Sequence, residues 1–283
     1  MSDFIQTFDQ VVESILAWLT DSGGFFFNAI SEVMTGLYSL INALFAFAPW
    51  WILCTIVALL AWRVVGVGFA IVSVAGLWLC QQMGLWKETM ETLTLVFTAT
   101  LLALVIAIPI GVLVGLSAKW KNGTELLMDF IQTMPLYIFL LPGIALLGYG
   151  PATAIWATCL VAIPPALKLT AHGVFTTPAQ FCELGTAVGM TNSSQIFKIR
   201  LPFAMPSILA GINQSLMLSF GMVVIAGIAG SGGLGQTIYE AVRTLKIDLA
   251  INAGIAIVVL TIILDRISQA MCSTQKEPDH GDA

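Results

Sequence analysis

The glycine-rich segment at residues 230–235 has the residue types and spacing for nucleotide chemistry. It reads GSGGLG, so Gly230, Gly232 and Gly235 fit the G-x-G-x-x-G pattern, and Asp248 follows at roughly the distance where an acidic residue would bind a ribose. That chemistry requires a strand before the glycines and a helix after them. Here the apolar run VVIAGIA precedes them and Asp248 begins another apolar run. The sequence therefore predicts a sharp chain reversal and close helix packing instead of dinucleotide binding.

Residues for metal or ATP chemistry are few. The five cysteines are scattered without a C-x-x-C pair, and the two histidines, His172 and His280, lie far apart in the sequence. The pattern G-x-x-x-x-G-K-[ST] does not occur, so the chain has no P-loop of its own. The sequence predicts no metal site, no cofactor bound by this chain and no enzymatic activity.

Composition places the chain in a membrane. Of its 283 residues, 58% are hydrophobic and only 10% are charged, with a mean hydropathy of +0.93, whereas soluble domains carry about 25% charged residues. The net charge of −5 argues against a nucleic-acid partner. We expect an all-α, polytopic membrane protein in contact with lipid.

Seven continuous apolar runs are predicted to be membrane spans, because a crossing helix needs about 20 residues. They lie near residues 49–64, 66–82, 92–117, 126–147, 151–169, 207–228 and 250–271. The first two are short and Arg63 separates them. A tight hairpin with Arg63 at its turn is favoured over one tilted helix, which would bury an arginine near the middle of the membrane.

The N-terminal extension, residues 1–48, differs from these runs. Over 25–48 apolar and polar residues alternate with a helical period, which predicts an amphipathic helix, lying along the membrane surface in preference to crossing it. The first 24 residues contain no Lys or Arg and so lack the basic region of a secretory signal.

The distribution of cations sets the orientation. With seven spans and a cytoplasmic C-terminus, eight of the eleven Lys and Arg residues face the cytoplasm, as the positive-inside rule favours. The N-terminus then lies outside, and the long polar connection 170–206 lies in the cytoplasm.

Residues 176–206 of this connection predict a helix–turn–helix elbow. Thr177, Pro178 and Gln180 suit an N-cap, a first helical position and a capping-box partner, and Gly189 suits the end of that helix. The elbow also carries apolar residues. They can pack against the elbow's own span ends or dock in the groove of a partner.

A second short helix, QIFKIRL, is expected to follow, with Ser193 or Ser194 as its cap. Pro202 and Pro206 are expected to break the chain before the next span.

The same segment resembles the EAA loop of ABC importer permeases. ELGTAVG, nine residues and IRLP follow the family pattern of E-A-A, three residues, G, nine residues and I-x-L-P. The matching positions are Glu183, Gly189, Ile199, Leu201 and Pro202. Leu184 and Gly185 replace the two alanines. The resemblance implies that these residues couple the chain to an ATPase.

The resemblance extends over about 88–272, which is similar to the permease subunits of glycine betaine/proline betaine importers. It implies a type I ABC importer permease fold with a core at 88–272, an accessory hairpin at 49–87 and a polar tail at 273–283. It also implies two copies of a cytosolic ATPase subunit that bind ATP and Mg, a periplasmic or tethered substrate-binding protein, a second copy of the permease and an inner-membrane location. Choline, carnitine or an amino acid remain alternative solutes. An autonomous carrier would leave the elbow unexplained.

Several polar and aromatic residues within spans are candidates for the translocation pathway. They are Gln132, Thr133, Pro135, Tyr137, Asn213, Gln214 and Phe220. Polar residues in spans usually face a bundle interior or a pathway, so hydrogen bonding between helices and lining of a cavity both remain open. Gly111 and Gly115 form a G-x-x-x-G pair that predicts a close helix contact, within the chain or with a second copy.

Overall fold

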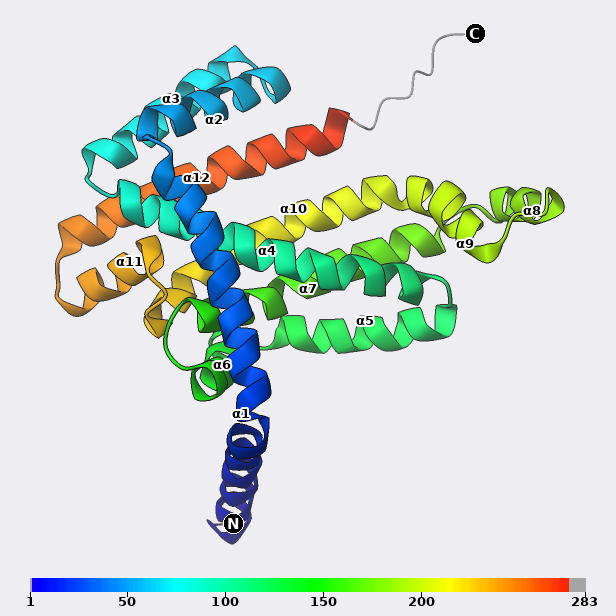
Figure 1. Ribbon diagram of the computed structural model, residues 1–283, viewed down its shortest axis with the longest axis horizontal. Coiled ribbons are helices and arrows are strands. Elements are labelled where there is room, and N and C mark those ends of the chain that lie inside the picture. The colour runs from blue at the N-terminus through cyan, green and yellow to red at the C-terminus, as the bar shows by residue number, and fades with distance from the viewer. Residues whose placement is uncertain (1, 275–283) are drawn as a thin grey trace.

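The computed structural model describes residues 2–274, and every secondary-structure element in this range is a helix. The predicted all-α fold is confirmed (Figure 1). The last nine residues of the predicted polar tail lie outside the described residues.

Three long helices form the centre of the fold. They are α4 (Trp86–Gly115), α7 (Pro151–Phe175) and α10 (Leu201–Ala226). Their main core is built from small and medium-sized side chains such as Ala99, Ala157 and Ala226, all fully buried. Small residues let helix backbones approach closely, which suits helices that pack within a membrane.

The G-x-x-x-G pair lies at the contact between α4 and α7. A Cβ atom added to Gly111 would stand 2.8 Å from the Thr170 Cβ, and one added to Gly115 would stand 2.6 Å from the Ala171 carbonyl oxygen. The predicted close contact is therefore confirmed, and it is made within the chain.

The predicted span 126–147 is broken in the structure. It is divided among α5 (Ala118–Thr133), the 3₁₀ turn η1 (Leu136–Phe139) and α6 (Leu140–Leu147). The chain bends by 100° between α5 and the following segment, Leu136–Leu147. Met134 adopts an extended conformation with ψ of 139°, as the residue before a proline prefers, so the helix ends ahead of Pro135.

The N-terminal helix α1 (Ser2–Phe47) is longer than predicted and runs across α4 (Figure 1). The Asn42 amide oxygen accepts a 3.4 Å hydrogen bond from the Thr94 hydroxyl, and the rings of Phe45 and Phe97 lie 6.3 Å apart. Its part from Gly23 to Phe47 is long and apolar enough to cross a membrane. This part of α1 shares an apolar pocket with Leu102 and Ile106, near the middle of α4. The interfacial position therefore stays a prediction.

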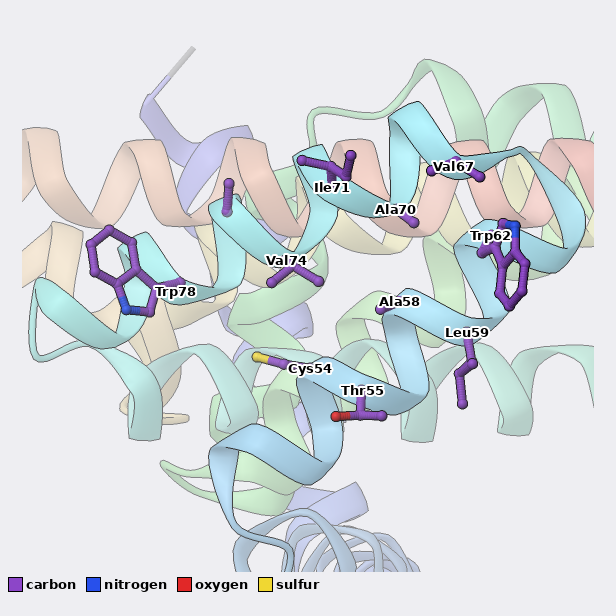
Figure 2. Close-up of a pocket in the computed structure, with 11 residues that line it drawn as sticks. Cys54, Thr55, Ala58, Leu59, Trp62, Val67, Ala70, Ile71, Val74 and Trp78 are labelled. Atoms are coloured by element: carbon purple, nitrogen blue, oxygen red, sulfur yellow. The ribbon is translucent and has the colours of Figure 1, made fainter.

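The next two helices form the predicted hairpin. They are α2 (Trp50–Val64) and α3 (Val67–Gln82), and Arg63 stands in the last turn of α2. Their 15 and 16 residues fall short of the ~20 that a perpendicular crossing needs. Between them lies an open apolar groove of about 760 Å³, and Figure 2 shows that its lining comes from both helices. Such a groove suits lipid contact.

The hairpin packs on the last long helix, α12 (Ile247–Thr274), where Gly76 lets Val259 come close. Within residues 2–274, five helices are long and apolar enough to cross, or six when the bent α5–α6 pair counts as one span. The seven predicted apolar runs are therefore all helical, but two are short and one is broken.

Candidate functional site

The elbow begins with α8 (Ala179–Ala187), one residue later than predicted. Pro178 has an extended ψ of 130° and occupies the N-cap position, where no side chain caps the helix. The Thr177 hydroxyl is buried and bonds to no described residue. The predicted capping box is wrong, because the extended proline moves the helix start past the reach of Thr177.

Two glycines shape the first helix of the elbow. Gly189 has a φ of +78°, and the N–H groups of Gly189 and Met190 donate to the carbonyls of Thr186 and Gly185, at 3.0 and 2.9 Å. This is the helix end predicted for Gly189. Gly185 is buried, and an added Cβ would stand 2.9 Å from the Ile199 Cδ1. The glycine found where the family pattern has alanine thus allows the two arms of the elbow to meet.

The second arm starts at α9 (Asn192–Gln195). Its cap is the Thr191 hydroxyl, which accepts a 3.3 Å hydrogen bond from the Ser194 N–H. The predicted cap at Ser193 or Ser194 is therefore wrong by two or three residues. Sequence alone does not separate adjacent hydroxyl residues that are all good caps.

The predicted break at Pro202 and Pro206 is also wrong. A five-residue π-helical turn, Ile196–Arg200, follows α9, and the helix continues without interruption from Asn192 to Ala229. Pro202 is the second residue of α10, which directly follows this π-helical turn. The wide π turn precedes it and relieves the contact that a proline ring makes with the carbonyl four residues earlier.

The elbow exposes an apolar tip, defined by Leu184, Val188 and Phe197, which are 63%, 72% and 66% exposed. Glu183 is exposed beside it and makes no side-chain hydrogen bond or ion pair with a described residue. Leu201 and Pro202 line a hollow of about 450 Å³ under the tip. Several exposed apolar side chains on one short elbow make it a candidate interaction site.

The tip is held firmly to the long helix behind it. The rings of Phe181 on α8 and Phe203 on α10 lie 4.8 Å apart, and the Gln195 amide donates a 3.0 Å hydrogen bond to the Thr186 hydroxyl. Ile199 is half-buried against Gly185. These contacts join the two arms of the elbow to each other and to α10.

Two of the pathway candidates share one polar cavity. Gln132 and Gln214 both line a space of about 400 Å³ between α5, α7 and α10. The full lining is Glu125, Gln132, Pro165, Lys168, Leu169, His172 and Gln214. The Lys168 Nζ lies 3.5 Å from the Gln132 Oε1 and forms an ion pair with Asp129.

The other candidates are more dispersed. Thr133 and Pro135 are exposed at the break between α5 and η1, and Tyr137 follows, 52% exposed. Asn213 is partly buried, and its Oδ1 bonds to no described residue. Phe220 is 4% exposed in the main core, so its ring has no open face in this conformation.

Sequence reasoning missed Lys168 as a lining residue of this cavity and Asp129 as its ion-pair partner. Lys168 entered only the count of cytoplasmic cations. A signal was present, because Pro165, Lys168, Leu169 and His172 follow the i, i+3, i+4, i+7 spacing of one helix face.

The glycine-rich segment begins α11 (Gly233–Arg243) and has the predicted conformational role. Gly230, Gly232 and Gly233 all have positive φ, from 72° to 81°. A Cβ on Gly227 would stand 2.2 Å from the carbonyl carbon of Gly235, so the chain crosses itself closely here. The helix N-terminus is filled by the chain itself, as Glu91 and Thr92 of α4 accept hydrogen bonds from the Gly233 and Leu234 N–H groups, both at 2.8 Å.

The bundle of apolar helices and the elbow that protrudes between α7 and α10 together indicate a class of protein, the permeases of binding-protein-dependent importers. Residues 107–271 match the family described as "Binding-protein-dependent transport system inner membrane component", and the chain belongs to this family. It is therefore a multi-pass inner-membrane transport component.

Individual relatives agree. The chain is 36% identical over 262 residues to the glycine betaine transport system permease protein OpuAB of Bacillus subtilis, covering 92% of each. It is 35% identical over 266 residues to the glycine betaine/carnitine transport permease protein GbuB of Listeria monocytogenes, covering 92% of this chain and 93% of the relative. The glycine betaine/proline betaine permease protein ProW of Escherichia coli is 39% identical over 214 residues, which cover 76% of this chain and 60% of ProW.

Among solved structures, the fold resembles the inward-facing MetNI methionine ABC transporter. Two crystal forms give TM-scores of 0.58 and 0.59 at 22% and 23% identity, covering 65% and 68% of this chain and 92% and 94% of the matched chain. The predicted type I importer permease fold is confirmed.

Proposed function

We propose that this chain is the permease subunit of an ATP-driven importer for quaternary ammonium solutes such as glycine betaine and proline betaine. The elbow carries the proposal, because it combines the family spacing with an exposed apolar tip braced against a long helix. The names of OpuAB, GbuB and ProW support the solute class. GbuB also favours carnitine as a second solute.

The apolar tip is the proposed contact with the cytosolic ATPase, one ATPase copy for each of two permease copies. The ATPase, and not this chain, would bind ATP and Mg. From Asn192 to Ala229 the helix has 38 residues, about 57 Å at 1.5 Å per residue. If this helix moves as a rigid body, a displacement of the tip would also displace the outer end of the bundle.

The exposed face of α10 supports pairing with a second copy. Past its first turn, the exposed positions of α10 are Met205, Pro206, Ala210, Gln214, Met217 and Gly221. The exposed faces of α4 and α12 carry bulky aliphatic residues instead, such as Leu101, Val105, Ile255 and Val258. Lipid suits the aliphatic faces. We assign the α10 face, with Gln132, Thr133, Pro135 and Tyr137 of the neighbouring segment, to a pathway between two permease copies.

The outer end of the bundle would receive solute from a periplasmic or tethered substrate-binding protein. In this orientation the C-terminus is cytoplasmic and the N-terminus lies outside. The elbow and most Lys and Arg residues then share the cytoplasmic side.

The test is uptake by a reconstituted system. The chain would be placed in liposomes with its cognate ATPase and binding protein, and uptake of radiolabelled glycine betaine, carnitine, choline and proline would be measured with and without ATP. We expect ATP-dependent accumulation of the quaternary ammonium solutes. Uphill accumulation by this chain alone, without nucleotide hydrolysis, would contradict the assignment.

A further inference from the structure

The polar cavity between α5, α7 and α10 contains charges of both signs. Lys168 of α7 lines the cavity, and its side chain forms an ion pair with Asp129 of α5, which lies at the edge of the cavity outside its lining; the two side chains are 30% and 57% exposed. Glu125 lines the same cavity and pairs with Lys121 at 3.0 Å. Ionisable residues within membrane helices are costly and mark a functional site by default.

Uncharged hydrogen-bonding groups surround the ion pair. Gln132 approaches Lys168 from α5, and Gln214 faces the same space from the exposed stripe of α10. The cavity volume of about 400 Å³ falls within the range of small-molecule sites, about 300–1,000 Å³. A ligand in this space would contact three helices, including the one attached to the elbow.

We propose that this cavity is a subsite for a small zwitterion that carries a quaternary ammonium group and a carboxylate. The ligand carboxylate would take the place of Asp129 on the Lys168 ammonium, with amide N–H groups of Gln132 and Gln214 as further donors. The quaternary ammonium has no N–H, so it would be held by charge alone, next to Asp129. The inference rests on the proposed function, because the solute class comes from there.

The subsite would select zwitterions because the ligand must replace the ion-pair partners of both Lys168 and Asp129. We call this replacement partner exchange. A ligand with only a positive charge that inserts between Asp129 and Lys168 leaves the lysine without a partner. A ligand with only a negative charge leaves the aspartate without one, and an uncompensated charge in a partly buried site is unfavourable. A zwitterion supplies both partners at once, so opening the ion pair leaves no charge alone.

Partner exchange also keeps binding weak. The intact Lys168–Asp129 pair competes with the ligand, and the exposed sides of both residues are screened by water and salt. Weak binding suits a solute that must leave toward the cytoplasm.

The experiment is protection of an introduced cysteine in the purified permease–ATPase complex, in nanodiscs and without binding protein. His172 lines the cavity and is exposed, so His172→Cys provides a maleimide-reactive site. Labelling by the chain without this substitution gives the background. The probes are glycine betaine, choline and acetate at equal concentration and equal ionic strength.

We expect glycine betaine alone to slow labelling, by about fivefold at four times its Kd, following the factor 1 + [L]/Kd. Lys168→Gln or Asp129→Asn in the same background should abolish protection, and Lys168→Arg should retain it. Leu126→Cys, which is 74% exposed on α5 and outside the cavity lining, should show no protection by any probe.

Three results would overturn the subsite: no protection by glycine betaine, equal protection by choline or acetate, or protection that survives Lys168→Gln. The uptake assay separates this failure from failure of the proposed function. ATP-driven betaine uptake by a complex that shows no protection at residue 172 would refute the subsite and leave the importer assignment intact.

Discussion

The Glu91 carboxylate of α4 accepts a 2.8 Å hydrogen bond from the backbone N–H of Gly233, 142 residues later in the chain. Thr92 binds the next N–H, of Leu234, at the same distance. Together they cap the N-terminus of α11, where the free N–H groups and the helix dipole favour a negative charge. The carboxylate therefore stands where a phosphate would sit in a nucleotide-binding protein.

Removing this cap should destabilise the outer end of the bundle. We expect Glu91→Ala to cost about 1–3 kcal/mol, because it leaves the N–H of Gly233 without its partner in a partly buried position. Glu91→Gln should cost less, since it retains an acceptor oxygen. The measurement is the free energy of unfolding of the purified chain in detergent, from the denaturant dependence of tryptophan fluorescence.

The control for Glu91 is Lys87→Gln. It removes the 3.7 Å ion pair between Lys87 and Glu91, in which Lys87 is 83% exposed, and leaves the cap in place. An exposed pair of this kind contributes little. If Lys87→Gln and Glu91→Ala lowered stability equally, the ion pair and not the cap would be responsible.

Two glycine-to-alanine substitutions should have opposite effects. In Gly115→Ala the new Cβ would stand 2.6 Å from the Ala171 backbone oxygen, so α4 and α7 must separate, at a cost of about 1–3 kcal/mol. Gly123→Ala adds a methyl group within α5 where no atom lies within 4 Å. It should stabilise the chain by up to about 1 kcal/mol, the difference in helix propensity. Thermal unfolding of both variants under the same conditions checks the pair; a stabilising Gly115→Ala would contradict the tight contact.

Much of this architecture follows from local sequence. Apolar runs and helical periods predicted α2, α3, α4, α7, α10 and α12, and the hairpin turn at Arg63, because these patterns depend on residues close in the chain. The Glu91–Gly233 cap could not be predicted, since a single sequence does not show which residue 142 positions away meets a helix end. The helix break predicted at Pro202 is wrong for a different reason. The π-helical turn before it lets the helix continue through the proline.

The candidate site, too, could be predicted from the sequence only in part. The spacing of Glu183, Gly189 and Ile199 identified the elbow, and the structure adds the reason for Gly185. The polar cavity depends on α5, α7 and α10 meeting, so only the separate residues Gln132 and Gln214 were found from the sequence. The burial of Phe220 in the core could not be predicted either. In a helix that is apolar on all sides, the local sequence does not show which way an aromatic side chain faces.

The two glycines of the elbow should respond differently to alanine. Gly185→Ala places a methyl group near the mobile end of Ile199, so uptake should stay above about half of the parent rate, while Gly185→Leu should separate the arms and uncouple ATP hydrolysis from uptake. Gly189→Ala forces a Cβ into a φ of +78° and should cost about 1 kcal/mol. ATPase activity and uptake measured together distinguish the outcomes; normal coupling in Gly185→Leu would refute the bracing role.

The apolar tip should decide ATPase binding. We expect Leu184→Asp and Val188→Asp to abolish co-purification with the ATPase, because each places a charge in the proposed contact. Both side chains are more than 60% exposed, so the permease itself should still insert and fold. Gln180→Asp, at an exposed polar position on the same helix, is the matched control. Co-purification of the Leu184→Asp and Val188→Asp variants at the parent level would place the ATPase contact elsewhere.

The side of the membrane on which α1 begins tests the span count. The interfacial position of α1 and seven crossings, with α2 and α3 as short crossings, put the N-terminus outside and the C-terminus in the cytoplasm. A cysteine at position 2, in Ser2→Cys, should therefore react with a membrane-impermeant maleimide added to intact cells. Labelling only after permeabilisation would show that the Gly23–Phe47 part of α1 crosses the membrane, as its length and hydropathy allow. Because α1 contacts α4 at Thr94 and Phe97, that result would also make α1 a full member of the bundle.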